Sequence, residues 1–279
     1  MTNRTLQQRF SGIQTADGEG VKLTRIIGSH QLDRFDPFLL LDCFESDDAD
    51  DYIGGFPTHP HRGFETVTYL LNGRMRHKDN AGHEGVIEPG GVQWMTAGKG
   101  ILHSEMPEQD EGLLKGFQLW VNLPAADKMT APAYQEYTPE VTPLESRDDG
   151  TQIRVIAGVN NHGTKGPVNN SYTQPTYMDI TLAGNKTFEQ SLPSQHNAFI
   201  YIVEGELTLQ DGEQPLVEKR LGLLSHGETL TVNSGASGAR FLLIAGKPLN
   251  EPVARSGPFV MNTQAELIQA FNDYRRGGF

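Results

Sequence analysis

Short runs of β-forming residues separated by turn residues constrain the fold of this chain most strongly. The clearest runs are VKLTRIIG, ETVTYLL, GFQLWVNL, IRVIAGV, YMDITL, AFIYIVEGELTL, GETLTV and RFLLIAG. The 31 glycines and 16 prolines are spread along the chain, which indicates frequent tight turns. Many short strands with turns at roughly regular spacing are typical of a β-sandwich or β-barrel, so we expect an all-β fold.

One segment near the C-terminus, NTQAELIQAFNDYRRGG, departs from the strand pattern. Thr263 and Glu266 have the spacing of a capping box, and Gly277 is typical of a helix end. Apolar side chains recur at helical spacing at Leu267, Ile268, Phe271 and Tyr274. We therefore expect a C-terminal helix that packs its apolar stripe against the rest of the chain.

The length of 279 residues allows one large domain or two smaller ones. The stretch 124–150 is proline-rich, polar and weakly periodic, and it separates two β-rich halves. The segment from His61 to Gly73 weakly resembles the segment from His196 to Gly205, as in an internal repeat. We expect a metal-binding domain at residues 1–135 and a related domain without metal ligands at residues 136–279.

Charge and composition exclude several classes of protein. The chain has 23 Lys and Arg against 35 Asp and Glu, a net charge of −12, which argues against direct binding to nucleic acid. It has neither a run of 18 apolar residues nor a secretory signal pattern, so we expect no membrane span. Cys43 is the single cysteine, so no internal disulfide can form, and we expect it to be buried. A cytoplasmic monomer is the simplest expectation.

The pair His59 and His61 flanks Pro60 in the segment FPTHPHRGFE. On an extended segment, residues i and i+2 point the same way about 6–7 Å apart, which suits two imidazoles on one metal ion. Pro60 stiffens the pair and favours an extended His59. Histidines at this spacing either bind a metal or are ordinary loop residues, and this pair alone does not decide between the two.

A second pair, His103 and Glu105 in GILHSEMP, repeats the i, i+2 spacing. Two extended segments with two ligands each could build a site of three imidazoles and one carboxylate. Such nitrogen and oxygen ligands suit Fe(II), Mn(II), Ni(II), Cu(II), Co(II) or catalytic Zn(II). Four protein ligands leave two positions of an octahedral metal open to a substrate or to dioxygen.

Other candidate residues have less support from spacing. We expect five further histidines to be surface or turn residues: His77, His83, His162, His196 and His226. Trp94 and Gln118 fall in predicted strands near the ligands. These two residues either line a cavity or take part in ordinary packing, and the sequence does not decide between the two.

Several long motifs resemble those of a known family. The spacing of His59, His61, Glu65 and Gly73 is similar to the first motif of the cupin superfamily, and EPGG at residues 88–91 is similar to part of the second. More narrowly, FPTHPHRGFETVTYLLNG, PGGVQWMTAGKGILHSE, GFQLWVNLP and GKPLNEPVARSGPFVMNT resemble the pirin family. The likeness covers most of the chain and implies a bicupin, two jelly-roll β-barrels with a C-terminal helix.

The resemblance bears on which glutamate would complete the site. In ordinary cupins the carboxylate follows the His-x-His pair, here Glu65, which on a straight strand lies about 13 Å from His61 unless Gly63 bends the chain. In pirins the carboxylate comes from the His-x-Glu pair, here Glu105. We therefore expect Glu105 as ligand and Glu65 as a supporting residue. Gln93 stands where the second cupin motif has histidine.

Resemblance to pirins implies a mononuclear Fe(II) site in the first barrel, held by His59, His61, His103 and Glu105. The implied activity is quercetin 2,3-dioxygenase, with a flavonol and O2 as substrates and Glu105 as ligand and proton acceptor. The alternative is a non-enzymatic iron-binding regulator, either a transcriptional co-regulator or a modulator of a metabolic enzyme. Either alternative role would act through a protein partner.

Overall fold

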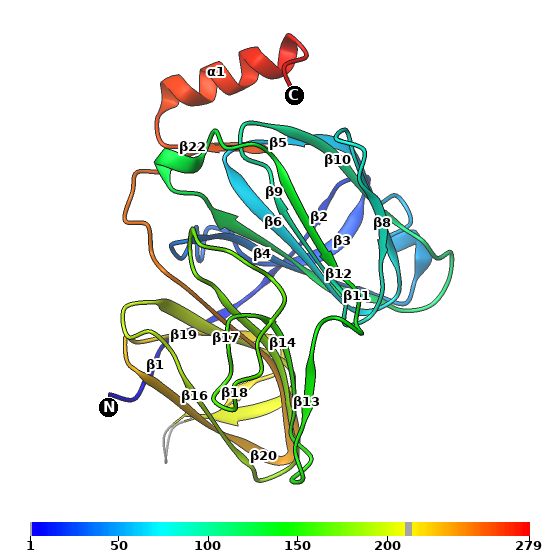
Figure 1. Cartoon of the computed structure of the whole chain (residues 1–279). Helices are drawn as coiled ribbons and strands as arrows, with labels where there is room; N and C mark the ends of the chain where they lie inside the picture. The colour runs from blue at the N-terminus through cyan, green and yellow to red at the C-terminus, as the bar shows by residue number, and fades with distance from the viewer. Residues whose placement is uncertain (1, 210–213) are drawn as a thin grey trace. The chain divides into compact units, whose positions relative to one another are not determined.

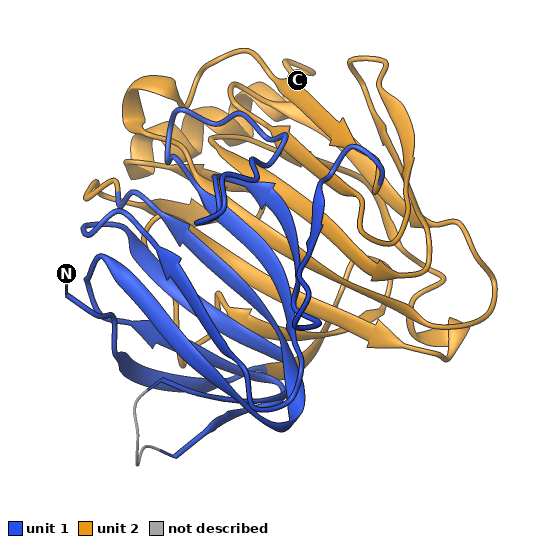
Figure 2. Cartoon of the chain, turned by 60° about the horizontal axis from the view of Figure 1, so that its bottom comes forward, with its two compact units in different colours: residues 1–12, 140–248 blue, residues 13–139, 249–279 orange. Residues whose placement is uncertain are grey.

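The computed structural model describes residues 2–209 and 214–279 of the chain. It confirms a mostly β fold with one C-terminal α-helix and two cupin-type domains (Figure 1). The contacts divide the chain into two units, shown in Figure 2. Unit 1 comprises residues 1–12 and 140–248, and unit 2 comprises residues 13–139 and 249–279. The predicted domains at residues 1–135 and 136–279 stay a prediction.

Unit 2 contains two main antiparallel sheets. The larger has the order β12-β9-β6-β11-β4-β3-β2, with bounds Ala133–Tyr137, Val92–Thr96, Phe64–Asn72, Leu114–Asn122, Phe38–Ser46, Val21–Ile27 and Ile13–Asp17. The smaller has the order β5-β10-β7-β8, with bounds Phe56–His61, Ile101–Pro107, Met75–Asp79 and Glu84–Ile87. Two 3-10 turns lie at Ala49–Asp51 and Ala125–Asp127.

Unit 1 contains one sheet of nine strands, of which seven follow the order β1-β19-β17-β20-β15-β14-β13. Their bounds are Leu6–Ser11, Arg220–Leu224, Asn197–Thr208, Thr229–Gly246, Thr176–Leu182, Gln152–Ala157 and Leu144–Ser146. Two further strands, β16 (Thr187–Ser191) and β18 (Leu216–Val217), pair with β20 and β17. Strand β20 pairs with β16 through its first half and with β15 through its second half, so one strand holds both parts together. In neither unit do the described strands close into a complete barrel.

The interiors of the two units differ in chemistry. Unit 1 is filled by a large apolar cluster that includes Ile180, Ile200, Leu230, Phe241 and Leu243. Unit 2 also buries apolar side chains, and in addition it buries a group of histidine, glutamate and threonine side chains. Cys43 is buried, as predicted. Buried polar groups require hydrogen-bond partners or a ligand, so the buried polar side chains of unit 2 indicate a candidate functional site.

Gly63 redirects the chain from β5 of the smaller sheet to β6 of the larger one. Its φ of +86° lies in the left-handed region, and a Cβ there would come within 1.9 Å of the Val260 carbonyl oxygen. Only glycine fits such a position without strain. The turn therefore places His61 and Glu65 on strands of different sheets.

The C-terminal segment forms a hairpin of β21 (Ala254–Ser256) and β22 (Phe259–Met261), followed by α1 (Gln264–Arg275) beside β22 (Figure 1). The capping box of Thr263 and Glu266 is confirmed. The predicted apolar stripe is only partly correct, because Leu267 is buried while Ile268 is 63% exposed. Ala270 is the second buried helix residue, since its position, one turn from Leu267, faces the hairpin.

Arg62 connects this helix to the strand that carries the histidine pair. Its side chain is 4% exposed and its Nη1 lies 2.7 Å from Asp273 Oδ2 of α1. Its Nε donates to the Lys99 carbonyl oxygen at 2.6 Å, and its guanidinium lies 4.4 Å from the centroid of the Phe279 ring. A buried guanidinium needs such partners, because its desolvation is costly.

Replacement of Asp273 by asparagine tests this connection. The change leaves the Arg62 cation buried without its carboxylate, so we expect the midpoint of unfolding in urea to move to a lower urea concentration. The matched control is Ile268→Gln at an exposed position of the same helix, which should change stability by less than about 0.5 kcal/mol. Equal stability of Asp273→Asn and wild type would contradict a structural role for the ion pair.

Candidate metal centre

Antiparallel pairing of β5 with β10 brings three histidines together. His59 pairs directly with His103, and His61 pairs with Ile101, so the three imidazoles share one face of the smaller sheet. Their ring centroids lie 4.4–4.9 Å apart. One ring nitrogen from each residue falls within 4.8 Å of the others, a geometry that can hold a metal ion. The pairing of the two His-containing segments expected from sequence therefore occurs.

Each of the three rings is fixed through its Nδ1 atom. His59 Nδ1 lies 2.8 Å from the Pro57 carbonyl oxygen, and His61 Nδ1 lies 3.4 Å from the Pro258 carbonyl oxygen. His103 Nδ1 lies 3.5 Å from Nδ1 of another histidine, His77. Contacts to Nδ1 select the tautomer and leave Nε2 for a metal, as in many histidine metal sites. In agreement, Nε2 of His59 and Nε2 of His61 are only 3.0 Å apart.

One buried nitrogen of the three histidines lacks a hydrogen-bond partner, as expected of an atom that binds a metal. Nε2 of His103 is buried and has no hydrogen-bond partner among residues 2–209 and 214–279. A buried nitrogen lone pair without a donor is costly unless a ligand occupies it. Burial also lowers the pKa of His61 and His103 well below the usual histidine value, so both rings are neutral and available to a cation. The site therefore suits a divalent metal with nitrogen ligands.

Glu105 lies on β10 and is 1% exposed. Thr68 Oγ1 donates to its Oε1 at 2.5 Å and Gln118 Nε2 donates to its Oε2 at 2.7 Å. Burial raises the pKa of the Glu105 carboxyl above its usual range. One nitrogen of each of the three histidines lies within 4.8 Å of the other two, and among the described residues this group does not include an oxygen of Glu105. Its role as fourth ligand therefore stays a proposal.

Glu65, the competing carboxylate, lies on β6 in the larger sheet. It is 1% exposed and accepts a hydrogen bond from Thr96 Oγ1 at 2.7 Å. It pairs across the sheet with Thr96 and Val121. Glu65 is thus part of a buried hydrogen-bonded network on the far side of the Gly63 turn from His61.

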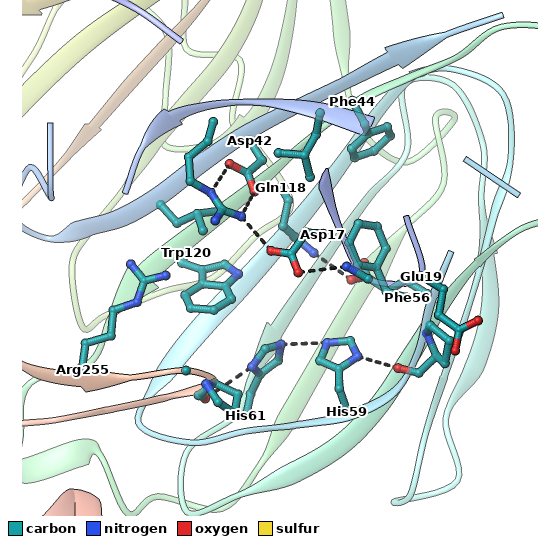
Figure 3. A pocket seen from close by; sticks show the side chains of 18 residues that line it. Asp17, Glu19, Asp42, Phe44, Phe56, His59, His61, Gln118, Trp120 and Arg255 are labelled. Atoms are coloured by element: carbon teal, nitrogen blue, oxygen red, sulfur yellow. Dashed lines mark hydrogen bonds and ion pairs between the residues drawn. The ribbon is translucent and has the colours of Figure 1, made fainter. Parts of the chain in front are cut away.

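Two of the three histidines, His59 and His61, line a cavity of about 540 Å³ (Figure 3), within the range of about 300–1,000 Å³ typical of small-molecule sites. His59, His61 and Glu105 line one part, and Gln118 and Trp120 line another. Gln118 therefore belongs to the cavity, whereas Trp94, 1% exposed and outside the lining, is packed in the interior. The cavity thus combines the candidate metal ligands with an aromatic wall.

Charged groups flank the remaining wall of the cavity. Arg25 donates to both carboxylate oxygens of Asp42, at 3.0 and 2.7 Å, and also to Asp17 at 2.8 Å. The guanidinium of Arg255 lies 4.7 Å from the centroid of the Trp120 ring. Sequence spacing did not single out these residues, because they lie on four separate strands, β2, β3, β4 and β21.

His77 was predicted to be a surface or turn residue, and this prediction is wrong. It lies on β7 with no exposed surface and faces the His103 ring. Its signal was present in the sequence, since His77 and Asp79 form a third pair of ligand-type residues at i, i+2. By contrast, the side chains of His83 and His162 are 49% and 57% exposed, as expected for surface residues.

Within the described residues, none of the helices has the length and apolar character needed to cross a membrane. Comparisons with known proteins bear directly on the family. A family model described as pirin matches residues 20–121, and one described as the pirin C-terminal cupin domain matches residues 177–279.

Individual relatives agree with the family models. A pirin-like protein of Caulobacter vibrioides is 51% identical over the full length of both chains. A Pseudomonas aeruginosa protein, provisionally named a quercetin 2,3-dioxygenase, is 49% identical over 98% of this chain and 97% of its own. A crystal structure of quercetin 2,3-dioxygenase from Acinetobacter baumannii superimposes with a TM-score of 0.89 at 34% identity, covering 99% of this chain and 98% of that one. The chain belongs to the pirin family of the cupin superfamily.

Proposed function

We propose that this protein is a metal-dependent dioxygenase that cleaves the heterocyclic ring of flavonols such as quercetin. The observation that carries the proposal is the group of three histidine nitrogens, of which two residues, His59 and His61, line a cavity of about 540 Å³. The names of the Pseudomonas and Acinetobacter proteins support the choice of reaction. In this reaction both atoms of O2 enter the organic product and one ring carbon leaves as carbon monoxide.

His59, His61 and His103 would hold the metal through Nε2, with Glu105 as the fourth ligand. Fe(II) is our choice among the divalent transition metals that such nitrogen and oxygen donors bind, which include Mn, Co, Ni, Cu and Zn. A bound metal would supply Lewis acidity and redox chemistry beside the open cavity. The residues themselves supply position, because each Nδ1 is fixed by its own partner.

Glu105 would accept the proton of the flavonol 3-hydroxyl group. Burial raises its pKa, which brings the carboxylate closer to the range where a general base works at neutral pH. Thr68 and Gln118 hold one oxygen each, so the carboxylate has a fixed direction. The Trp120 ring, whose centroid lies 5.1 Å from that of the His61 ring, gives the cavity an aromatic wall against which a planar substrate can pack.

The first prediction concerns metal binding alone. Substitution of His61 by alanine removes a nitrogen from the centre, so we expect the affinity for Fe(II) to fall more than about 100-fold. Elemental analysis after anaerobic loading and gel filtration measures it, with a wild-type stoichiometry of one metal per chain. His30→Ala, at an exposed histidine, is the matched control and should bind as wild type does. Unchanged loading of His61→Ala would place the metal elsewhere.

The second prediction concerns the reaction. Anaerobically loaded protein mixed with quercetin and then air should consume O2 and release carbon monoxide in equal amounts. His61→Ala should lack both signals. An O2 electrode and a carbon monoxide assay report the two gases. Stoichiometric iron with no O2 uptake would contradict the dioxygenase proposal and favour the iron-binding regulatory role.

The third prediction concerns the orientation of the Glu105 carboxylate by Thr68. Thr68→Val keeps the shape of the side chain but removes the donor to Glu105 Oε1. We expect kcat for quercetin to fall about 10-fold while Fe(II) affinity stays within about threefold, because the base loses its orientation. Thr66→Val is the control on the same buried strand, since Thr66 Oγ1 has no partner among the described side chains. Equal kcat for Thr68→Val and wild type would rule out this role of the hydroxyl.

A further inference from the structure

His77 lies next to the candidate centre on the neighbouring strand. In the pairing of β7 with β10, His77 lies opposite Glu105 and Asp79 lies opposite His103. The side chains of His77 and Asp79 are both fully buried. A buried histidine and a buried carboxylate beside a metal site need an explanation, because neither contributes to an apolar core.

The side chains of His77 and Asp79 form a series of polar contacts that leads away from His103. Nδ1 of His77 lies 3.5 Å from Nδ1 of His103, and Nε2 of His77 lies 3.9 Å from Asp79 Oδ2. Tyr134 stacks on the His77 ring, with centroids 4.9 Å apart and planes inclined by 26°. The His77 ring is therefore held between its neighbours and cannot turn freely.

Asp79 is fixed more firmly than His77. Its Oδ1 accepts the backbone N–H groups of Ala81 and His83, each at 2.9 Å. Its Oδ2 lies 2.8 Å from Nδ1 of His83, whose side chain is 49% exposed. This series of polar contacts thus runs from His103 through His77 to the buried carboxylate of Asp79, and it ends at the half-exposed His83.

When Nε2 of His103 binds a metal, only one placement of the ring hydrogens allows neutral His103 and His77 to form these contacts as hydrogen bonds. Nδ1 of His103 then carries hydrogen and donates to Nδ1 of His77, which must be the unprotonated nitrogen. The hydrogen of His77 therefore sits on Nε2, on the side of Asp79 Oδ2. Nε2 of His77 has no hydrogen-bond partner within 2–209 and 214–279, so a small shift toward Asp79 would complete this series of contacts.

We propose that His77 and Asp79 are positioning residues of the metal centre, which fix the tautomer of His103 and make it a stronger electron donor. The inference rests on the metal site of the proposed function and adds two residues to it. It also distinguishes His103 from the other two ligands, because His59 and His61 donate to neutral carbonyl oxygens of Pro57 and Pro258. Removal of such supporting partners commonly lowers metal affinity about 10–100-fold.

Titration of the full-length metal-free protein with Co2+ tests the inference, because the absorption bands of bound Co2+ report its ligands directly. His77→Phe keeps a ring beside Tyr134 but has no acceptor, so we expect the Kd for Co2+ to rise about 10–100-fold with shifted bands. His77→Asn places an oxygen near the former Nδ1 but loses the contact to Asp79, so it should bind Co2+ more tightly than His77→Phe and less tightly than wild type. His77→Gln places its oxygen near the former Nε2 and should not restore affinity.

Asp79→Asn supplies a second, independent test if His77→Phe does not fold. Its amide oxygen can still accept the two backbone N–H groups, so the loop keeps its shape, but the negative charge is lost. We expect the Kd for Co2+ to rise about 10-fold. His83→Gln, the control at the exposed end, should change the Kd less than about threefold.

The outcomes separate this inference from the proposed function. Wild type that binds one Co2+ while His77→Phe and Asp79→Asn bind equally well, with unchanged bands, would overturn the inference alone. Wild type that binds no Co2+ would overturn both the inference and the proposed metal site. Weakened binding in His77→Phe and Asp79→Asn, with partial rescue by His77→Asn, is the result that the structure leads us to expect.

Discussion

The pairing of β5 with β10 is the interaction on which the candidate site depends. Direct opposition of His59 and His103 places two imidazoles side by side, and the i, i+2 spacing adds His61 on the same face. The register shifts between His103 and Glu105, so Glu105 lies opposite Phe56 instead of Pro57. Such irregularities re-aim a side chain, and here the carboxylate is held by Thr68 and Gln118 of the larger sheet.

The two units use the same kind of strands for different purposes. Unit 1 fills its interior with apolar side chains and so resembles an ordinary core. Unit 2 gives part of its interior to histidine and carboxylate side chains, and each of their buried polar atoms requires a hydrogen bond or a ligand. The partners of His59, His61 and Glu105 meet that need, and the orphan Nε2 of His103 marks where a ligand is still required.

The sequence predicted the fold class, the helix with its capping box, and the meeting of the two His-containing segments. These features depend on local periodicity and on a short-range pattern of two residues. Spacing could not reveal how Gln118, Trp120 and Arg255 come to share one cavity, since their meeting depends on sheet order. The burial of His77 follows from the place of β7 between β10 and β8 in the smaller sheet, which the i, i+2 spacing of His77 and Asp79 does not reveal.

Anomalous diffraction from crystals grown anaerobically with Fe(II) tests the central claim most directly. The account predicts a single strong iron peak within bonding distance of Nε2 of His59, His61 and His103, with Glu105 as the fourth protein ligand. Occupancy should be close to one metal per chain, and the cavity beside Trp120 should remain open to a substrate. An iron peak at another place in the chain, or fully loaded crystals in which these histidines remain unligated, would contradict the account.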